Sequence, residues 1–210
     1  MIVRKILILI IALFWGGKAA YAQQTNATEA RDLFDSVYQM VFGKQGSTLH
    51  YDVNIIGIYK TNGTIWYKEK KMRYSEPRYA SWNDGITAYM VDHKKKTVGI
   101  YRSDDDNKDT YLSKFKYNLN DYEYSWKNVD DGIEITLKPK RSGLIGIRQV
   151  KGVIDKDTHY PLYLRIKVAF FWTTVRISNF RSGSIGDYNF IFPALQFKSY
   201  TTTDHRKDKK

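Results

Sequence analysis

Residues 79–101 read YASWNDGITAYMVDHKKKTVGIY, and this stretch decides the fold class. Runs rich in aromatic and β-branched residues alternate here with polar connections. The runs cover residues 79–82, 86–91 and 97–101, and the connections are Asn83-Asp84-Gly85 and residues 93–96. Because aromatic and β-branched residues favour strands while Asn, Asp and Gly favour tight turns, the stretch predicts three consecutive antiparallel strands.

The same pattern continues on both sides of this stretch. Tyr51 and Val53 alternate with polar neighbours, and Asn62-Gly63 predicts a two-residue hairpin turn within residues 58–67. Further strands are predicted over residues 72–74, 133–137, 144–154, 162–170, 174–180 and 188–192. Short turns without crossover helices connect these strands, so we expect one antiparallel sheet that is curved or rolled.

Two segments depart from the strand pattern. Residues 29–42 carry apolar side chains at helical spacing, including Leu33 and Val37, and Gly43 follows as a stop signal. Residues 111–126 are rich in aromatics without clean alternation, and we interpret them as one or two irregular helices. The sequence therefore predicts a mainly β domain of the α+β class, with an N-terminal helix and a short central one.

The first 22 residues have the features of a cleavable signal peptide. Basic Arg4 and Lys5 precede an apolar run over residues 6–15, and Ala20-Tyr21-Ala22 forms a cleavage site. The apolar run is about half the ~20 residues that a membrane span needs. We expect Sec-type export with cleavage after Ala22, a single domain over residues 23–200, and a basic disordered tail over residues 201–210. The chain has no cysteine, which excludes a lipid anchor at a lipobox.

The chain carries a formal net charge of +12. A basic protein suggests nucleic acid as a partner, but the expected export argues against it. In an exported protein the excess positive charge either favours contact with anionic membrane surfaces or belongs to solvated lysines without a specific partner. Both interpretations are compatible with the sequence.

Motifs for catalysis and metal binding are missing from the sequence. The four histidines are widely separated, and no nucleophile elbow, P-loop or dinucleotide fingerprint occurs. An EF-hand loop starting at Asp104 would need Gly and Glu where Asp109 and Phe115 stand. We expect no catalytic residue, no metal site and no cofactor, so the protein is predicted not to be an enzyme.

The aromatic content is the unusual feature, with 17 Tyr, 10 Phe and 5 Trp. Aromatic residues occupy both faces of predicted strands, as in residues 169–172 and 188–192. One apolar face fills a core, and apolar residues on the second face need a helix or a ligand to cover them. A lipid-binding cleft and an ordinary packed core both explain this pattern.

The order of several motifs resembles the LolA/LolB family of outer-membrane lipoprotein carriers. In the first half these are GTIWYK at residues 63–68, KMRYSEP at residues 71–77 and WNDGITAYMVD at residues 82–92. In the second half they are IEITLKPK at residues 133–140, PLYL at residues 161–164 and YNFIFP at residues 188–193. The resemblance spans most of the chain, from about Ala30 to Pro193.

This resemblance implies a fold and a function. The fold is a strongly curved antiparallel sheet forming an unclosed half-barrel, covered by the N-terminal helix and a short central helical lid. A LolA-type member is a monomeric periplasmic carrier that takes lipoproteins from an inner-membrane exporter and passes them to an outer-membrane acceptor. Acyl chains lie between sheet and lid, and the positions matching that cleft are Trp66, Met72, Tyr74, Trp82 and Tyr89.

Two features differ from the family pattern. Lys68-Glu69-Lys70 stands where the family has an Arg-Pro pair whose arginine latches the lid, and the region between Tyr101 and Trp126 is short for the central lid helices. Either another residue closes the lid or the lid is held differently. Two other functions stay open: a lipid-binding or sensing module of the same fold that does not shuttle, and a secreted hydrolase.

Overall fold

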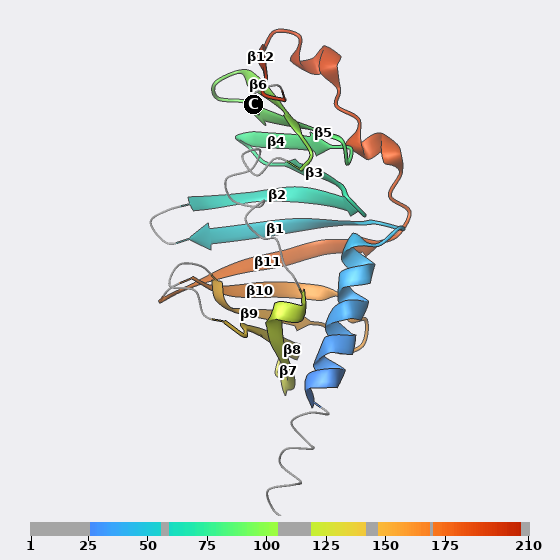
Figure 1. Cartoon of the computed structure of the whole chain (residues 1–210), viewed down its shortest axis with the longest axis vertical. Helices are drawn as coiled ribbons and strands as arrows, with labels where there is room; N and C mark the ends of the chain where they lie inside the picture. Colours follow the sequence, from blue (N-terminus) through green and yellow to red (C-terminus); the bar gives the residue numbers. More distant parts are fainter. Residues whose placement is uncertain (1–25, 56–58, 105–118, 142–146, 169, 207–210) are drawn as a thin grey trace, which may run out of the picture.

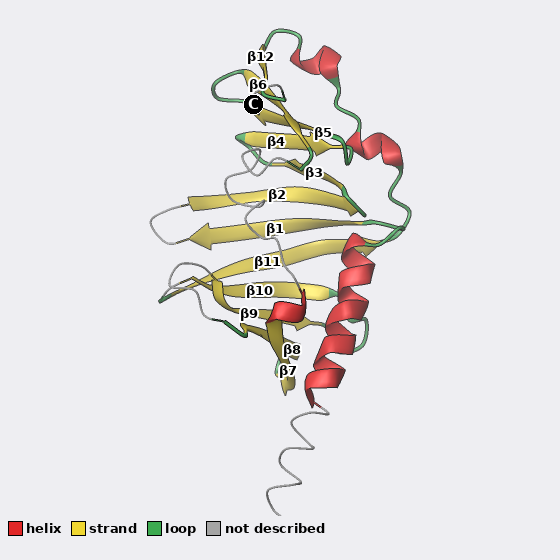
Figure 2. Ribbon diagram, viewed as in Figure 1, coloured by secondary structure: helices red, strands yellow, loops and turns green. Residues whose placement is uncertain are grey.

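The computed structural model describes residues 26–55, 59–104, 119–141, 147–168 and 170–206. The predicted signal peptide lies outside these ranges. The N-terminal helix covers residues 26–42, close to the predicted range, and is the long red helix of Figure 2. It ends at Gly43, whose amide donates a hydrogen bond to the carbonyl of Gln39 at 2.9 Å. A Cβ at position 43 would lie only 2.3 Å from that carbonyl oxygen, so glycine is required there.

The first half of the sheet is a meander of six consecutive antiparallel strands. They are β1 (Ser47–Ile55), β2 (Tyr59–Lys68), β3 (Lys71–Ser75), β4 (Tyr79–Asn83), β5 (Thr87–Asp92) and β6 (Thr97–Arg102). The turn between β4 and β5 has the predicted chemistry, because one carboxylate oxygen of Asp84 accepts the amides of Ile86 and Thr87, each at 2.8 Å.

The predicted hairpin turn at Asn62-Gly63 was wrong. Both residues lie inside β2, where Asn62 pairs with Asp52 and Gly63 pairs with Tyr51 of β1. A Cβ at position 63 would lie 2.5 Å from the carbonyl oxygen of Ser75 and 3.0 Å from the hydroxyl of Tyr51. The glycine therefore permits a close approach to neighbouring groups instead of a turn.

The second half of the sheet follows a single-turn 3₁₀ helix, η1 (Leu119–Asp121). Its strands are β7 (Tyr122–Val129), β8 (Gly132–Pro139), β9 (Ile147–Ile154), β10 (Pro161–Val168) and β11 (Phe171–Ser182). Of the predicted central helices, η1 is the described part, and residues 111–118 lie outside the described ranges. The helical interpretation was wrong from Tyr122 to Trp126, because these residues pair with β8. Tyr and Trp occupy every second position of this segment with Glu and Ser between them, which is the alternation of a strand.

The C-terminal segment returns along the sheet to its far edge. It contains two 3₁₀ helices, η2 (Asp187–Phe190) and η3 (Ala194–Phe197), and a short strand, β12 (Thr201–Asp204), that pairs parallel with β6. The strand predicted at residues 188–192 was wrong because this segment packs on the sheet with its side chains instead of joining a ladder. The tail prediction needs correction as well, since residues 201–204 extend the sheet.

The strand order is β12-β6-β5-β4-β3-β2-β1-β11-β10-β9-β8-β7. The two halves meet in the middle of the sheet, where Tyr51 of β1 pairs with Ile177 of β11 (Figure 1). Along the described strands the ladder runs from β12 to β7 without joining these two edges. The sheet is therefore mostly antiparallel, strongly curved and not closed into a barrel, as predicted.

Each face of the sheet has its own apolar contacts. We call the face that carries Leu49, Ile65 and Tyr74 the helix face, because the ring of Phe42 from the helix contacts Tyr67 on it at 4.7 Å between centroids. The other face, here the opposite face, carries Trp82 and is covered over β4–β6 by the C-terminal segment. Among the described helices none is long and apolar enough to cross a membrane.

Candidate functional site

The helix face of β1–β5 carries a continuous apolar surface. Its centre consists of four buried side chains, Leu49, Tyr51, Ile65 and Tyr74. Partly buried apolar side chains from six strands surround this centre: Val53, Tyr67, Met72, Tyr79, Met90, Val175, Ile177 and Phe180. Strand alternation and register bring them together, since Leu49, Ile65 and Tyr74 are direct partners across three adjacent strands.

The N-terminal helix packs mainly on the neighbouring part of this face. Leu33, Phe34 and Val37 contact the cluster of β7–β10, and the ring of Phe34 lies 5.6 Å from that of Tyr124. Only the last turn of the helix reaches β2, through Phe42 and Tyr67. Figure 1 shows the same arrangement, with the helix alongside the lower strands and β1–β5 above it.

Two tyrosine hydroxyls are among the polar groups at the centre of the helix face. The hydroxyl of Tyr51 donates a short hydrogen bond to the carboxylate of Glu76. The hydroxyl of Tyr74 points at the thioether sulfur of Met90, 4.0 Å away. Rings with a polar tip and flexible thioethers form a surface that adapts to apolar ligands of different shape.

The five positions predicted to line the cleft do not share one face. Met72 and Tyr74 lie on the helix face, in contact with the apolar surface described above. Trp66, Trp82 and Tyr89 lie on the opposite face, because Arg73, the residue between Met72 and Tyr74, pairs with Trp66 and Trp82. Sequence motifs alone do not give this separation, since it depends on the parity of each residue in its strand.

The C-terminal segment covers two of these three residues. The ring of Phe192 stacks on Tyr89 at 4.2 Å with an interplanar angle of 2°, and it meets Trp82 edge-on at 5.6 Å. Phe197 also contacts Trp82, at 5.6 Å. The opposite face of β4–β6 is thus a packed core whose cover comes from the same chain.

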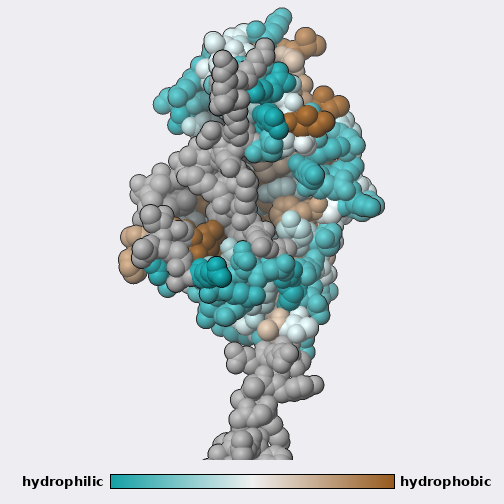
Figure 3. All heavy atoms as spheres, viewed as in Figure 1, coloured by the Kyte–Doolittle hydropathy of each residue, from teal (hydrophilic) through white to brown (hydrophobic). Residues whose placement is uncertain are grey.

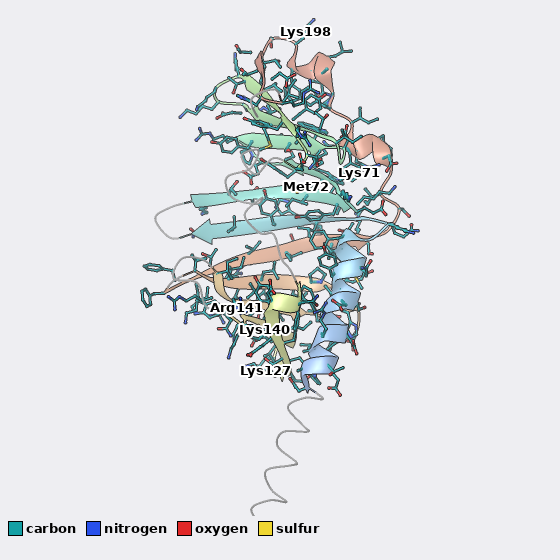
Figure 4. The ribbon with its side chains drawn as sticks, viewed as in Figure 1. Lys71, Met72, Lys127, Lys140, Arg141 and Lys198 are labelled. Carbon is teal, nitrogen blue, oxygen red and sulfur yellow. The ribbon has the colours of Figure 1, made fainter. Side chains whose placement is uncertain are left out.

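Ion pairs hold this segment at both ends of the Lys68–Lys71 turn, of which Lys68-Glu69-Lys70 stands where the family pattern has its Arg-Pro pair. Lys68 and Lys71 both contact the carboxylate of Asp187 in η2, at 2.9 and 3.1 Å. Hydrogen bonds from the two ammonium groups lower the pKa of Asp187 below its ordinary value. Figure 4 shows Lys71 beside η2, on the side of the sheet away from the edge strand β7. These lysines fasten the C-terminal segment to the hairpin of β2 and β3.

The histidines have separate structural settings. His50 contacts the hydroxyl of Thr64, His93 that of Tyr200, and the ring of His205 stacks on Tyr101. His159 has a positive φ of 57° in the turn before β10. Within the described ranges no three His, Asp or Glu side chains converge as metal ligands would.

Two hollows lie along the sheet, the first with a partly polar lining and the second with a mostly apolar one. One, of about 360 Å³, is bordered by Thr48, Leu49, His50, Thr64, Asn179 and Arg181. The other, of about 450 Å³, lies beside the helix and is bordered by Glu29, Asp32, Leu33, Ser36, Trp126 and His159. The candidate site is the apolar surface on the helix face of β1–β5, because it is built from side chains of six strands. The first hollow borders this surface at Leu49, and the second lies beside the N-terminal helix.

No family model matches the chain, and no curated protein matches it in sequence. Among solved structures, an uncharacterized conserved protein from Thermus thermophilus is similar over 84% of this chain and 99% of its own, with a TM-score of 0.57 and 10% identity. A DUF1329 family protein from Desulfovibrio piger matches with a TM-score of 0.45 and 17% identity, over 81% of this chain and 99% of its own. A LolA superfamily protein from Nitrosomonas europaea matches with a TM-score of 0.42 and 9% identity, over 79% and 99%. The likeness to the Thermus thermophilus protein is one of fold. The open sheet and the N-terminal helix of this chain agree with the fold class predicted from its sequence.

Proposed function

We propose that this protein is a carrier of the bacterial envelope that binds the acyl chains of lipoproteins and conveys them to the outer membrane. The observation that supports this most is the apolar surface on the helix face of β1–β5. Its members come from six strands, and the described apolar side chains of the helix pack mostly on the other half of the sheet.

The chemistry of that surface suits an acyl chain. Each methylene group removed from water contributes about 0.8 kcal/mol, so a long chain needs apolar area and no catalytic group. Met72 and Met90 provide side chains that adjust to a flexible ligand, and the hydroxyl of Tyr74 lies 4.0 Å from the sulfur of Met90. The acyl site that we propose keeps Met72 and Tyr74 from the sequence prediction and places Trp66, Trp82 and Tyr89 outside it.

The setting of this function follows from the sequence. We propose a periplasmic protein without a lipid anchor, which the predicted signal peptide and the absence of cysteine favour. By resemblance to LolA-type carriers, it receives cargo from an inner-membrane exporter and passes it to an outer-membrane acceptor. We propose that it acts as a monomer, without catalysis and without a cofactor.

Binding can be tested with the protein purified from the periplasm and a synthetic triacylated peptide. Native mass spectrometry should show a one-to-one complex with the acylated peptide and none with the same peptide lacking its acyl chains. If the protein binds neither peptide, the carrier function is excluded.

Variants can locate the site. Met72→Gln and Met90→Gln together should weaken binding about tenfold or more, because they place amides against the acyl chain. Ile100→Gln is the matched control, since Ile100 pairs with Tyr89 and so lies on the opposite face. Equal losses in the variant and the control would exclude the helix face as the acyl site.

Carrying and sensing differ in what happens after binding. Deletion of the gene should leave outer-membrane lipoproteins in the inner membrane if the protein shuttles them. Correct lipoprotein localisation in the deletion strain, together with tight binding in vitro, would favour the non-shuttling lipid-binding module.

A further inference from the structure

The hairpin of β10 and β11 ends in unusually exposed phenylalanines. Phe170 is 84% exposed and Phe171 is 78% exposed, and Val168, which pairs with Phe171, is exposed as well. Figure 1 shows this hairpin reaching the left margin of the molecule, where Figure 3 shows pale-brown apolar atoms that project outward. Large apolar side chains exposed together at a tip indicate a surface that contacts a membrane or another protein.

Cations surround the base of this tip. Around the ring of Trp172, the guanidinium carbon of Arg165 and the ammonium nitrogens of Lys167 and Lys151 lie at 5.0, 5.7 and 5.9 Å from the centroid. The guanidinium carbon of Arg148 lies 5.9 Å from the centroid of Phe170. A tryptophan among cations next to exposed phenylalanines is the composition of a membrane–water interface.

These positive charges are largely uncompensated along the hairpin. Strands β9, β10 and β11 contain no Asp or Glu. The ion pairs described for this surface involve Lys151, which contacts Glu134 of β8 at 2.8 Å, and none of them includes Arg165 or Lys167. A partner for this surface must therefore bring negative charge together with an apolar interior.

We propose that the tip of the β10–β11 hairpin docks on anionic lipid bilayers. Phe170 and Phe171 enter the interfacial region while Arg165 and Lys167 meet the phosphates of the headgroups. A bilayer provides both required features on one surface, apolar below and anionic above. This docking surface is separate from the proposed acyl site, so its test needs no lipoprotein cargo.

The test is co-sedimentation of the protein purified from the periplasm with vesicles. We expect binding to vesicles of phosphatidylethanolamine and phosphatidylglycerol, weaker binding to phosphatidylcholine vesicles, and loss of binding as salt rises. Phe170→Ser with Phe171→Ser should reduce affinity about tenfold or more. Arg165→Gln with Lys167→Gln should reduce it by about tenfold on anionic vesicles only.

Matched controls keep the result specific. Ile191→Ser with Leu195→Ser changes side chains that are 67% and 87% exposed on the C-terminal segment and should leave vesicle binding unchanged. Lys94→Gln with Lys95→Gln removes the same charge from the exposed turn after β5 and should have a much smaller effect. Absence of vesicle binding by the unaltered protein overturns the proposal, and so do equal losses in variants and controls.

A second measurement does not depend on the folding of the phenylalanine variants. Brominated phosphatidylglycerol should quench part of the tryptophan fluorescence of the unaltered protein, and Trp172→Phe should remove the quenched part. Quenching that persists fully in Trp172→Phe would contradict docking through this hairpin.

Discussion

The guanidinium carbon of Arg73 lies 4.4 Å from the centroid of the Trp66 ring, on the opposite face of the sheet. Trp82 lies on β4, the other neighbour of β3, and its ring centroid is 5.3 Å from the same guanidinium carbon. The Nε atom is buried and has no hydrogen-bond partner among the described residues, and burial lowers the pKa of Arg73. Two indole rings thus contact a partly buried cation.

Arg73→Lys should reduce the free energy of unfolding by about 1–2 kcal/mol, because an ammonium group cannot stack flat between two rings. Arg73→Met should cost less, since it fills similar space without burying a charge. Urea denaturation monitored by tryptophan fluorescence measures both. If Arg73→Met reduces the free energy of unfolding as much as Arg73→Lys or more, then the stacking of the guanidinium on the rings does not stabilise the fold.

A second prediction concerns the pH dependence of stability through Glu134. Burial alone would raise the pKa of this carboxyl, but Lys151 at 2.8 Å and Lys127 at 3.6 Å lower it overall. A carboxylate with a folded-state pKa below its unfolded one stabilises at neutral pH and loses that contribution as pH falls through the folded-state value. Glu134→Gln should therefore cost about 1 kcal/mol at pH 7, with the difference shrinking below about pH 4.5.

Urea denaturation of the unaltered protein and of Glu134→Gln at several pH values tests this prediction. Lys127→Gln is the control: its side chain is well exposed and lies farther from the carboxylate, so its effect should be smaller. A Glu134→Gln difference that stays constant down to about pH 3 would mean that the ion pairs do not stabilise the fold.

Gly63 provides a third prediction. Gly63→Ala should reduce the free energy of unfolding by about 1–3 kcal/mol, since its methyl group would displace the carbonyl of Ser75 or the ring of Tyr51. Gly152→Ala in β9 is the matched control, because its methyl group would only reach Leu164 at 3.4 Å. Thermal denaturation of the two variants should rank them clearly, and equal melting temperatures would contradict the close approach at Gly63.

The fourth prediction concerns the exposed edge of β7. The side-chain amide of Asn26 donates to the carbonyl of Trp126 and accepts from its amide, each at 3.0 Å, and so continues the hydrogen bonding of an edge strand. Asn26→Ala should lower the free energy of unfolding by about 1–2 kcal/mol and speed hydrogen exchange at the Trp126 amide. Asn128→Ala changes an exposed asparagine of the same strand and should alter neither quantity.

The parts of the fold that local patterns determine were predicted from the sequence. The meander over β3–β6 and its Asp84 turn follow from alternation and turn chemistry, and the N-terminal helix follows from the spacing of Leu33 and Val37. The prediction at Asn62-Gly63 failed because a glycine also serves close packing inside a strand. The strand predicted at residues 188–192 failed because Phe190 and Phe192 pack on a distant part of the sheet.

The candidate site was less accessible to sequence reasoning. Tyr74 and Trp82 are both aromatic strand residues in recognisable motifs, yet the register that pairs Arg73 with Trp82 places them on different faces. Leu49, Ile65 and Met90 belong to the apolar surface, but none of them was among the predicted cleft positions, although Ile65 and Met90 lie within the quoted motifs. The odd or even position of each residue in its strand would group them on one face only if the register between neighbouring strands were already known.

The pairing of Tyr51 with Ile177 has a consequence for how the chain folds. The six early strands form a meander of local hairpins. In contrast, β1 also pairs with β11, and Trp82 contacts Phe192, both of which lie more than 100 residues later in the sequence. Contacts so distant along the chain form late and slowly. The sheet and its aromatic cover can therefore be completed only after residues near the C-terminal end of the chain are available.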